Sequence, residues 1–307
     1  MATALTIIQD CSKEIGIASP LTVFGSTDTT VLQMAALLTR EGKELAARTS
    51  NNEGWPSLRA LHQFDLTVVT GLTGTLTADS AVITGISSTA SLLAGYGALG
   101  SGIPASVHIL TVDSGTQITL DRPVTTSGSA VALTFGKDKY AFPSDLQYFI
   151  NRTGWDRTSK WELVGPMMAT EWQFLESGYP ATGFLYRFRV MTDKLVLHPI
   201  PETTARISME YYSKNWCQSA GGTGQAAFAA DTDTPILDDF LLTLGLKWRF
   251  LRAKGLDYAQ EQRTYEDAVE RSLARAGTGR DLPLNASAGR VNRLIDFGNV
   301  PDSGFGS

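Results

Sequence analysis

The stretch from residue 66 to residue 135 differs abruptly from the rest of the chain, and this break limits what the chain can fold into. It contains no Lys and no Glu, and Thr, Ser, Gly, Ala and Val dominate it. β-Branched runs alternate there with turn-forming clusters, a pattern typical of short strands. The runs are Leu66–Thr70, Ala81–Ile86, Val107–Val112, Thr116–Leu120 and Ala130–Phe135. We predict a small β-sandwich or barrel over residues 65–136, inserted in a helical host, with a hairpin turn at Asp113-Ser114-Gly115-Thr116.

The host begins with residues 1–64, for which we predict a pair of helices. Apolar residues at helical spacing start at Leu5, and a second apolar stripe follows Asp28. Thr27 or Asp28 can cap the second helix. Gly42 lowers the stability of that helix by about 1 kcal/mol relative to Ala, so we expect a bend or an early end near it.

Residues 137–234 form the next part of the host, an aromatic-rich segment followed by strands. Pro143-Ser144-Asp145-Leu146 predicts a helix start with Ser144 as its cap. Three strands are expected, at Phe184–Met191, Lys194–Pro199 and Ala205–Tyr212. The first two close around Thr192-Asp193, and Gly221-Gly222-Thr223-Gly224 is interpreted as a flexible connector.

The host ends in a helical hairpin predicted over residues 235–276. Thr234 is placed to cap its first helix, Pro235 to be the first helical residue, and Gly255 to separate it from the second helix. Residues 277–307 lack a periodic pattern, so we predict an extended arm that is disordered or ordered by a partner. The fold class is therefore α+β: a helical bundle with a long C-terminal hairpin, an inserted β domain, a second antiparallel β region and an extended arm.

Size and charge set further limits on function. The 307 residues are 43% hydrophobic, enough to fill a core, and the formal net charge is −5. An acidic balance argues against a protein that coats duplex DNA, so any contact with DNA is expected to be loose. Cys11 and Cys217 lie far apart and outside any paired motif, so we expect reduced thiols. We see no signal peptide and no membrane-spanning run.

The search for catalytic motifs yields one match, and its context is wrong. Gly95-Tyr96-Gly97-Ala98-Leu99-Gly100 has the glycine spacing of a dinucleotide-binding loop. Such a loop opens a helix whose N-terminus holds the pyrophosphate, whereas Pro104 and further β-type residues follow here. We interpret the motif as a glycine-rich β turn.

Metal-binding patterns are equally weak, and we predict no cofactor, no metal and no enzymatic activity. The three histidines are His62, His108 and His198. None has a second ligand at metal-binding spacing, so each is interpreted as structural. A carboxylate cluster consists of Asp231, Asp233, Asp238 and Asp239. It could hold a hard cation, but capping at a helix start explains it more simply.

Two groups of residues are candidates for contact with other macromolecules. A basic patch on the first helix of the hairpin consists of Lys247, Arg249, Arg252 and Lys254. Acids and bases balance over residues 238–275, so a solvated or intersubunit ion-pair face explains the patch better than a specific contact with DNA; we predict an intersubunit or channel face. The aromatic candidates are Trp155, Trp161 and Trp172. They could stack on bases, but no excess of Arg and Lys accompanies them, which favours core packing or a protein interface.

Taken in order, the host motifs resemble the head-to-tail adaptor family of tailed bacteriophages, also called tail accessory or head-completion proteins. The motifs are Trp55-Pro56-Ser57-Leu58, then Tyr140-Ala141-Phe142-Pro143-Ser144-Asp145-Leu146, Trp161 and Trp172, Leu197-His198-Pro199-Ile200-Pro201, and Ile207–Tyr212. A glycine-rich loop, the helical hairpin and the arm follow them. The resemblance covers residues 1–64 and 137–276, and residues 66–135 depart from it.

The resemblance implies a non-catalytic ring of twelve copies in the virion neck, assembled in the host cytoplasm. It implies contact with the portal protein and with a tail nozzle or tail tube protein, and passage of the genomic DNA through the ring without specific binding. By analogy, the arm would reach along the portal or a neighbouring subunit. Its candidate contact residues are Arg280, Leu282, Leu284, Arg290, Val291, Arg293, Phe297 and Phe305.

Two alternatives come from other functional classes. The inserted β domain also suits a receptor- or glycan-binding tail component. An enzyme such as a peptidoglycan hydrolase needs a pair of positioned carboxylates, and Glu is absent from residues 54–161. We rank the enzyme last.

Overall fold

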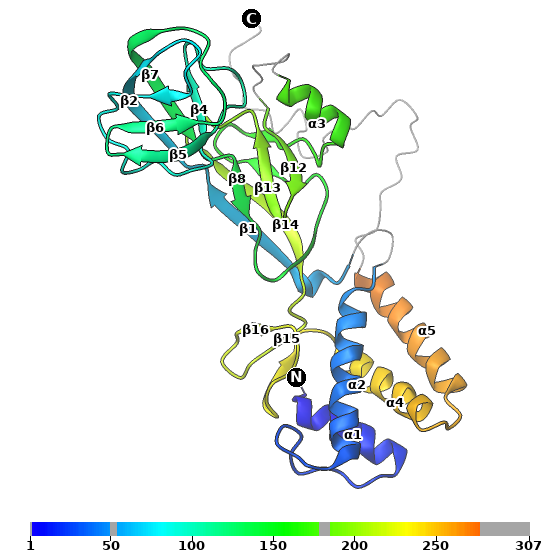
Figure 1. Ribbon diagram of the computed structural model, residues 1–307. Coiled ribbons are helices and arrows are strands. Elements are labelled where there is room, and N and C mark those ends of the chain that lie inside the picture. The colour runs from blue at the N-terminus through cyan, green and yellow to red at the C-terminus, as the bar shows by residue number, and fades with distance from the viewer. Residues whose placement is uncertain (1, 50–53, 178–184, 277–307) are drawn as a thin grey trace, which may run out of the picture.

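The computed structural model describes residues 2–49, 54–177 and 185–276. The described chain is α+β and elongated, with a helical unit at one end and small antiparallel sheets at the other (Figure 1). Buried apolar side chains form three separate clusters, one in the helices, one in the inserted segment and one between the remaining sheets. None of the helices in these ranges is long and apolar enough to cross a bilayer.

The helical unit joins both ends of the sequence. It contains α1 (Ala4–Ile15), α2 (Thr29–Ala46), α4 (Asp239–Ala253) and α5 (Ala259–Ala276). The helices α1, α2 and α5 all contact α4, and the apolar stripes of the four helices meet in one core. Asp28 caps α2 through the Thr30 N–H (2.8 Å), as predicted, and Gly255 adopts a positive φ of 71° between α4 and α5.

Two details of this unit correct the sequence prediction. The helix α2 continues past Gly42 to Ala46, and the missing side chain at Gly42 leaves room for the indole of Trp216. The cap of α4 is Asp238, whose carboxylate accepts from the Phe240 N–H (3.0 Å). Pro235 is not helical, since Thr234–Pro235 form β17 and pair with β15 (Cys217–Gln218).

The glycine-rich connector is also ordered. Gly224–Gln225 form β16, which pairs with β15, and the Ser219 N–H bonds to the carbonyl of Thr223 (2.9 Å). Gly222 supplies the positive φ of 81° that the turn requires. The predicted flexible connector is therefore a tight hairpin turn.

Two further sheets form the middle of the molecule. The larger contains β1 (Arg59–Asp65), β14 (Arg206–Ser213), β10 (Trp155–Asp156), β11 (Trp161–Glu162) and β9 (Leu146–Phe149). The smaller contains β12 (Arg187–Met191), β13 (Lys194–His198) and β8 (Lys139–Ala141). A short 3-10 turn, η1 (Pro56–Leu58), precedes β1, and α3 (Ala169–Glu176) lies beside β12 and β13 (Figure 1). The predicted hairpin around Thr192-Asp193 is confirmed, with Met191 opposite Lys194.

The helix predicted to start at Pro143 is wrong. Residues 146–149 form β9 instead, with Phe149 opposite Tyr211 in β14. The Asp145 carboxylate, expected in the first turn of a helix, accepts from the Tyr211 hydroxyl (2.9 Å) and the Ser213 hydroxyl (2.6 Å). These partners are more than 60 residues away in sequence, so no local pattern reveals them.

The inserted segment folds as two three-stranded sheets around one core. The first contains β2 (Val68–Leu76), β7 (Gly128–Gly136) and β4 (Gly97–Gly100). The second contains β3 (Val82–Ile83), β6 (Gln117–Leu120) and β5 (Ile109–Ser114). The hairpin predicted at residues 113–116 joins β5 to β6, with Ser114 opposite Gln117. No closed barrel forms within the described chain, which removes the barrel from the two predicted architectures.

Candidate functional site

A buried ionic cluster joins three helices of the helical unit. Glu41 of α2 is completely buried and accepts hydrogen bonds from Arg249 of α4 and Tyr265 of α5. Arg249 also binds Glu44 (2.6 Å). Burial raises the pKa of Glu41, and the bonds from Tyr265 and Arg249 counter that effect only in part. Because a buried unpaired charge is costly, this cluster fixes how α2, α4 and α5 pack.

The four bases predicted to form one patch point in different directions. Arg249 is buried in the ionic cluster. Lys247 binds Glu14 of α1 (3.1 Å) and Glu261 of α5 (3.2 Å) within the same chain. Arg252 and Lys254 are exposed, the first near the Tyr258 ring and the second near the Phe250 ring. Of the four, these two are therefore the ones free to meet another molecule.

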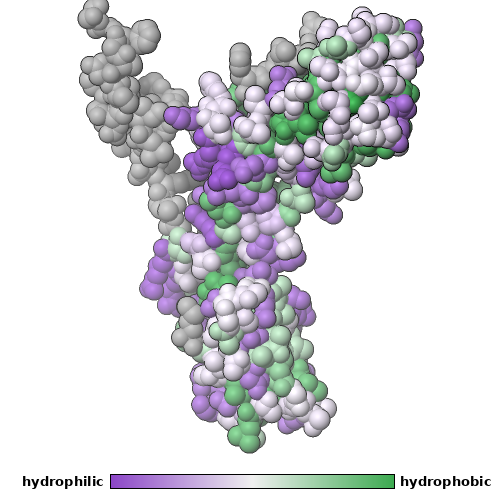
Figure 2. All heavy atoms as spheres, turned by 90° about the vertical axis from the view of Figure 1, so that its left-hand side faces the viewer, coloured by the Kyte–Doolittle hydropathy of each residue, from purple (hydrophilic) through white to green (hydrophobic). Residues whose placement is uncertain are grey.

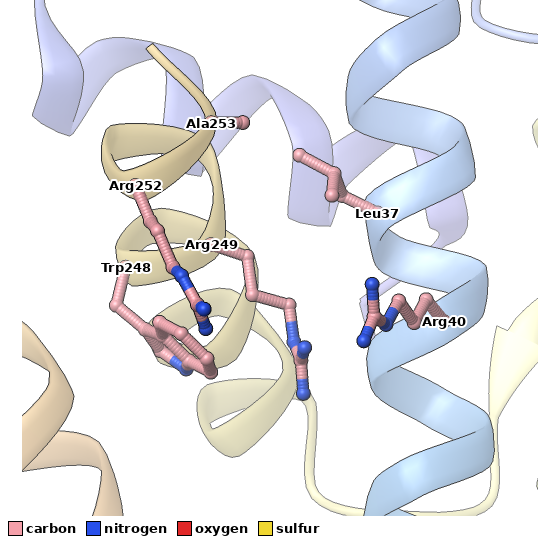
Figure 3. Close-up of a pocket in the computed structure, with 6 residues that line it drawn as sticks. All are labelled: Leu37, Arg40, Trp248, Arg249, Arg252 and Ala253. Atoms are coloured by element: carbon pink, nitrogen blue, oxygen red, sulfur yellow. The ribbon is translucent and has the colours of Figure 1, made fainter. Parts of the chain in front are cut away.

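A groove opens between α2 and α4 beside the ionic cluster. We call it the arginine groove. The residues that line it are Leu37, Arg40, Trp248, Arg249, Arg252 and Ala253 (Figure 3). The groove has a volume of about 300 Å³. Figure 3 shows Arg249 reaching from α4 toward Arg40 on α2, while Arg252 and Trp248 lie on α4 itself. Arginine side chains from two helices thus converge on one hollow.

A larger groove of about 560 Å³ lies where the inserted segment meets the sheet of β8 and β13. Its lining residues are His108, Asp138, Lys139, Trp172, Gln173, Glu176, Met191, Thr192, Lys194 and Val196. His108 of the inserted segment binds the buried Asp138 (2.8 Å), so this pair ties the segment to the host. Both acids and bases line the groove, which gives it no single charge preference.

The remaining predicted groups serve structure rather than chemistry. Asp238 caps α4, Asp239 accepts from the Ala2 N–H (2.9 Å), and Asp233 accepts from the Ala229 and Ala230 N–H groups (2.7 and 2.9 Å). The groups of His, Cys, Asp and Glu in the described ranges include no cluster of three that could hold a metal. His198 is buried, and burial lowers its pKa.

The glycine motif and the cysteines are equally structural. Gly97 belongs to β4 and packs against Ile200, where a Cβ would lie 2.4 Å from the Ile200 Cδ1 atom. The motif begins in a turn, as predicted, where Gly95 has a positive φ of 88°, and it continues as the strand β4; no helix follows it directly to hold a phosphate. Cys11 and Cys217 are both free thiols, as predicted, and burial raises the pKa of each to about 12.

The three candidate tryptophans fall into two groups. Trp172 is buried and packs edge-on against His198. Trp155 and Trp161 are 38% and 53% exposed on the paired strands β10 and β11. Trp155 lies opposite Glu162 and Trp161 opposite Asp156, so the two indoles leave opposite faces of the sheet and form no common stacking surface. The candidate residues of the arm, 280–305, lie outside the described residues.

The chain's charged residues hold helices together, and its hollows lie between secondary-structure elements rather than around a reactive group. The family model described as SU10 adaptor protein matches residues 107–293, about three fifths of the chain. The chain therefore belongs to the SU10 adaptor protein family, and it is a structural adaptor of a phage virion.

The matched range agrees in part with the segments that carry the resemblance. It contains the whole of residues 137–276 and none of residues 1–64, and it begins inside the inserted segment. No curated protein matches the sequence. The family implies contacts with head and tail components of the phage.

Proposed function

We propose that twelve copies of this chain form a ring that joins the portal to the tail nozzle or tail tube. The family match carries this proposal, because it identifies a phage adaptor. A ring closes when each copy presents one surface to its neighbour and a different, complementary surface to the neighbour on the other side. The elongated chain, with helices at one end and sheets at the other, offers such separate surfaces (Figure 1).

The charge of the chain suits a channel for DNA. The formal net charge of −5 gives DNA no strong general attraction. Two of the predicted bases, Lys247 and Arg249, are held by acids of the same chain, which reduces the positive charge on the helices. The genome passes through such a ring without binding tightly to its wall. Assembly takes place in the host cytoplasm, and the ring then stays in the virion neck.

The function is structural and needs no catalytic step. The buried carboxylate Glu41 is occupied by Arg249 and Tyr265, and it is not placed to transfer a proton to a substrate. The family likewise points to a non-enzymatic protein.

Native mass spectrometry of the chain mixed with its cognate portal tests this proposal. We expect a complex that contains one portal and twelve copies of the chain. A chain that keeps its isolated mass in the presence of the portal would overturn the proposal and favour the receptor-binding alternative. The Lys254→Glu variant, tested in parallel, shows whether an exposed base of α4 contributes to ring formation.

A further inference from the structure

The arginine groove offers hydrogen-bond donors and no acceptor side chain. Its lining residues with polar groups are Arg40, Arg249, Arg252 and Trp248, and its other lining residues are Leu37 and Ala253. Trp248 is 5% exposed, and its Nε1 atom has no hydrogen-bond partner in the described part of the chain. Buried indole N–H groups usually find an acceptor. The Trp248 indole N–H therefore lacks an acceptor in the described chain, and another molecule or segment that binds in the groove can supply one.

The charges around the groove are only partly balanced. Glu44 binds both Arg40 (2.7 Å) and Arg249 (2.6 Å), and Glu41 binds Arg249. Arg252 makes no ion pair with any described residue, although it lies near the Tyr258 ring. Within the described chain, the groove thus combines one unpaired guanidinium with a buried indole N–H that lacks a partner, beside apolar surface from Leu37 and Ala253. This combination suits a carboxylate on a short apolar stem.

The chain itself contains a segment of that chemistry. Residues 294–300, Leu-Ile-Asp-Phe-Gly-Asn-Val, hold one acid and no base, and the acid Asp296 stands between apolar residues. Asp296 lies twenty positions after Ala276, the end of α5. An extended chain of that length spans about 65 Å. The segment can therefore reach the groove of its own copy or of a neighbouring copy.

We propose that the arginine groove binds residues 294–300 of this chain, with the Asp296 carboxylate accepting from Arg252 and from the Trp248 indole N–H. The apolar neighbours of Asp296 then cover Leu37 and Ala253. In a ring this contact links adjacent copies; that intersubunit role rests on the proposed function, whereas the contact itself does not.

Indole N–H signals in the NMR spectrum of the full chain, labelled with ¹⁵N at tryptophan, test the contact. The Trp248 signal is identified by its loss in Trp248→Phe, which keeps an aromatic ring and removes the donor. We expect Asp296→Asn and Arg252→Gln each to move this signal and to leave the other five tryptophan signals in place. Asp302→Asn and Lys254→Gln are the matched controls, and they should leave the Trp248 signal unchanged.

A synthetic peptide of residues 292–303 gives a second readout. It is titrated into the full-length Asp296→Asn chain, and we expect binding at least tenfold tighter than that of the same peptide with Asn at position 296. Equal binding of the two peptides, or a Trp248 signal that Asp296→Asn does not move, would overturn the proposal. A short DNA duplex that moves the Trp248 signal when Asp296→Asn does not would overturn it too, and would identify a phosphate site. No portal is present in these experiments, so their outcome is independent of ring formation on the portal.

Discussion

At the scale of single residues, Gly42 shows how one position joins distant parts of the chain. A Cβ at Gly42 would lie 2.3 to 2.4 Å from three ring atoms of Trp216. The indole cannot easily move away, because its N–H binds the Ala226 carbonyl (2.9 Å) and its ring packs edge-on against Phe228. The glycine thus weakens the isolated helix α2 but permits close packing of this helix on the indole.

We predict that Gly42→Ala destabilises the helical unit by about 1–3 kcal/mol, although Ala is the better helix former. The denaturation midpoint, followed by far-UV circular dichroism, measures this effect. The exposed neighbour Lys43 is the control, since Lys43→Ala should change stability by less than about 0.5 kcal/mol. A Gly42→Ala chain as stable as the wild type would show that the indole gives way.

Asp231 anchors the loop between α1 and α2. Its carboxylate accepts from the Thr22 hydroxyl (2.6 Å) and from the Val23 and Phe24 N–H groups (both 2.9 Å). Burial raises the pKa of Asp231, but these three hydrogen bonds together hold the pKa below its ordinary value of 3.8. A lowered pKa means that the folded state favours the charged form.

The stability that the Asp231 carboxylate contributes should therefore depend on pH in a stated direction. It is present above the ordinary pKa of 3.8 and is lost as the pH falls through the lower pKa of the folded state. We predict that Asp231→Asn is less stable than the wild type at about pH 7 and that the difference shrinks on acidification. Denaturation of both chains between about pH 3 and pH 7 measures it; a constant difference would contradict the role of the charge.

At the scale of elements, local patterns located most of the helices and most of the strands, and they failed where distant contacts decide the structure. The apolar stripes of α1, α2, α4 and α5 recur every three or four residues, and that spacing is visible in the sequence. The strand β9 is decided by Asp145 and its partners in β14, which no local pattern contains. The cap of α4 was predicted at the wrong residue, because Thr234-Pro235 has the pattern of a helix start. In the structure these two residues instead pair as a strand with Cys217–Gln218.

The sequence indicated only some of the residues that form the arginine groove and the ionic cluster. Four bases were predicted to form one patch, whereas Arg252 and Lys254 are exposed and Arg249 is buried. Its partners Glu41 and Glu44 lie more than 200 residues away, and the charge balance within the hairpin gave no sign of them. The groove also depends on Leu37 and Arg40 of α2, which only the packing of α2 on α4 brings beside Arg252.

The polypeptide enters and leaves the inserted segment at two adjacent points, near Thr67 and Lys137. The Lys137 N–H binds the Thr67 carbonyl (2.9 Å), and the Thr67 N–H binds the Tyr140 hydroxyl (2.9 Å). The segment has its own buried core, and its surface is mostly pale in Figure 2, as expected where Thr, Ser and Gly predominate. It can therefore be removed without opening the core of the helices.

We predict that replacing residues 68–136 with a four-residue Gly-Ser linker leaves a folded chain that still binds the portal. Circular dichroism and native mass spectrometry with the portal check the two parts of this prediction. If the shortened chain assembles but its virions no longer attach to the host, the segment is a receptor-binding domain, as the alternative holds. If the chain folds but no longer joins the portal, the segment is part of the assembly surface.

At the scale of the whole molecule, an adaptor links two larger structures, the head and the tail of the phage. The chain is elongated and has three buried clusters, and the ionic cluster of Glu41 holds the helices in one arrangement. The account therefore requires that heads and tails stay apart when the chain is missing.

Electron microscopy of phage particles assembled without this chain tests that requirement most directly. The account predicts heads and free tails that fail to join, and tailed particles that return when the purified chain is added to the extract. Tailed particles at the usual frequency in the absence of the chain would contradict the adaptor function.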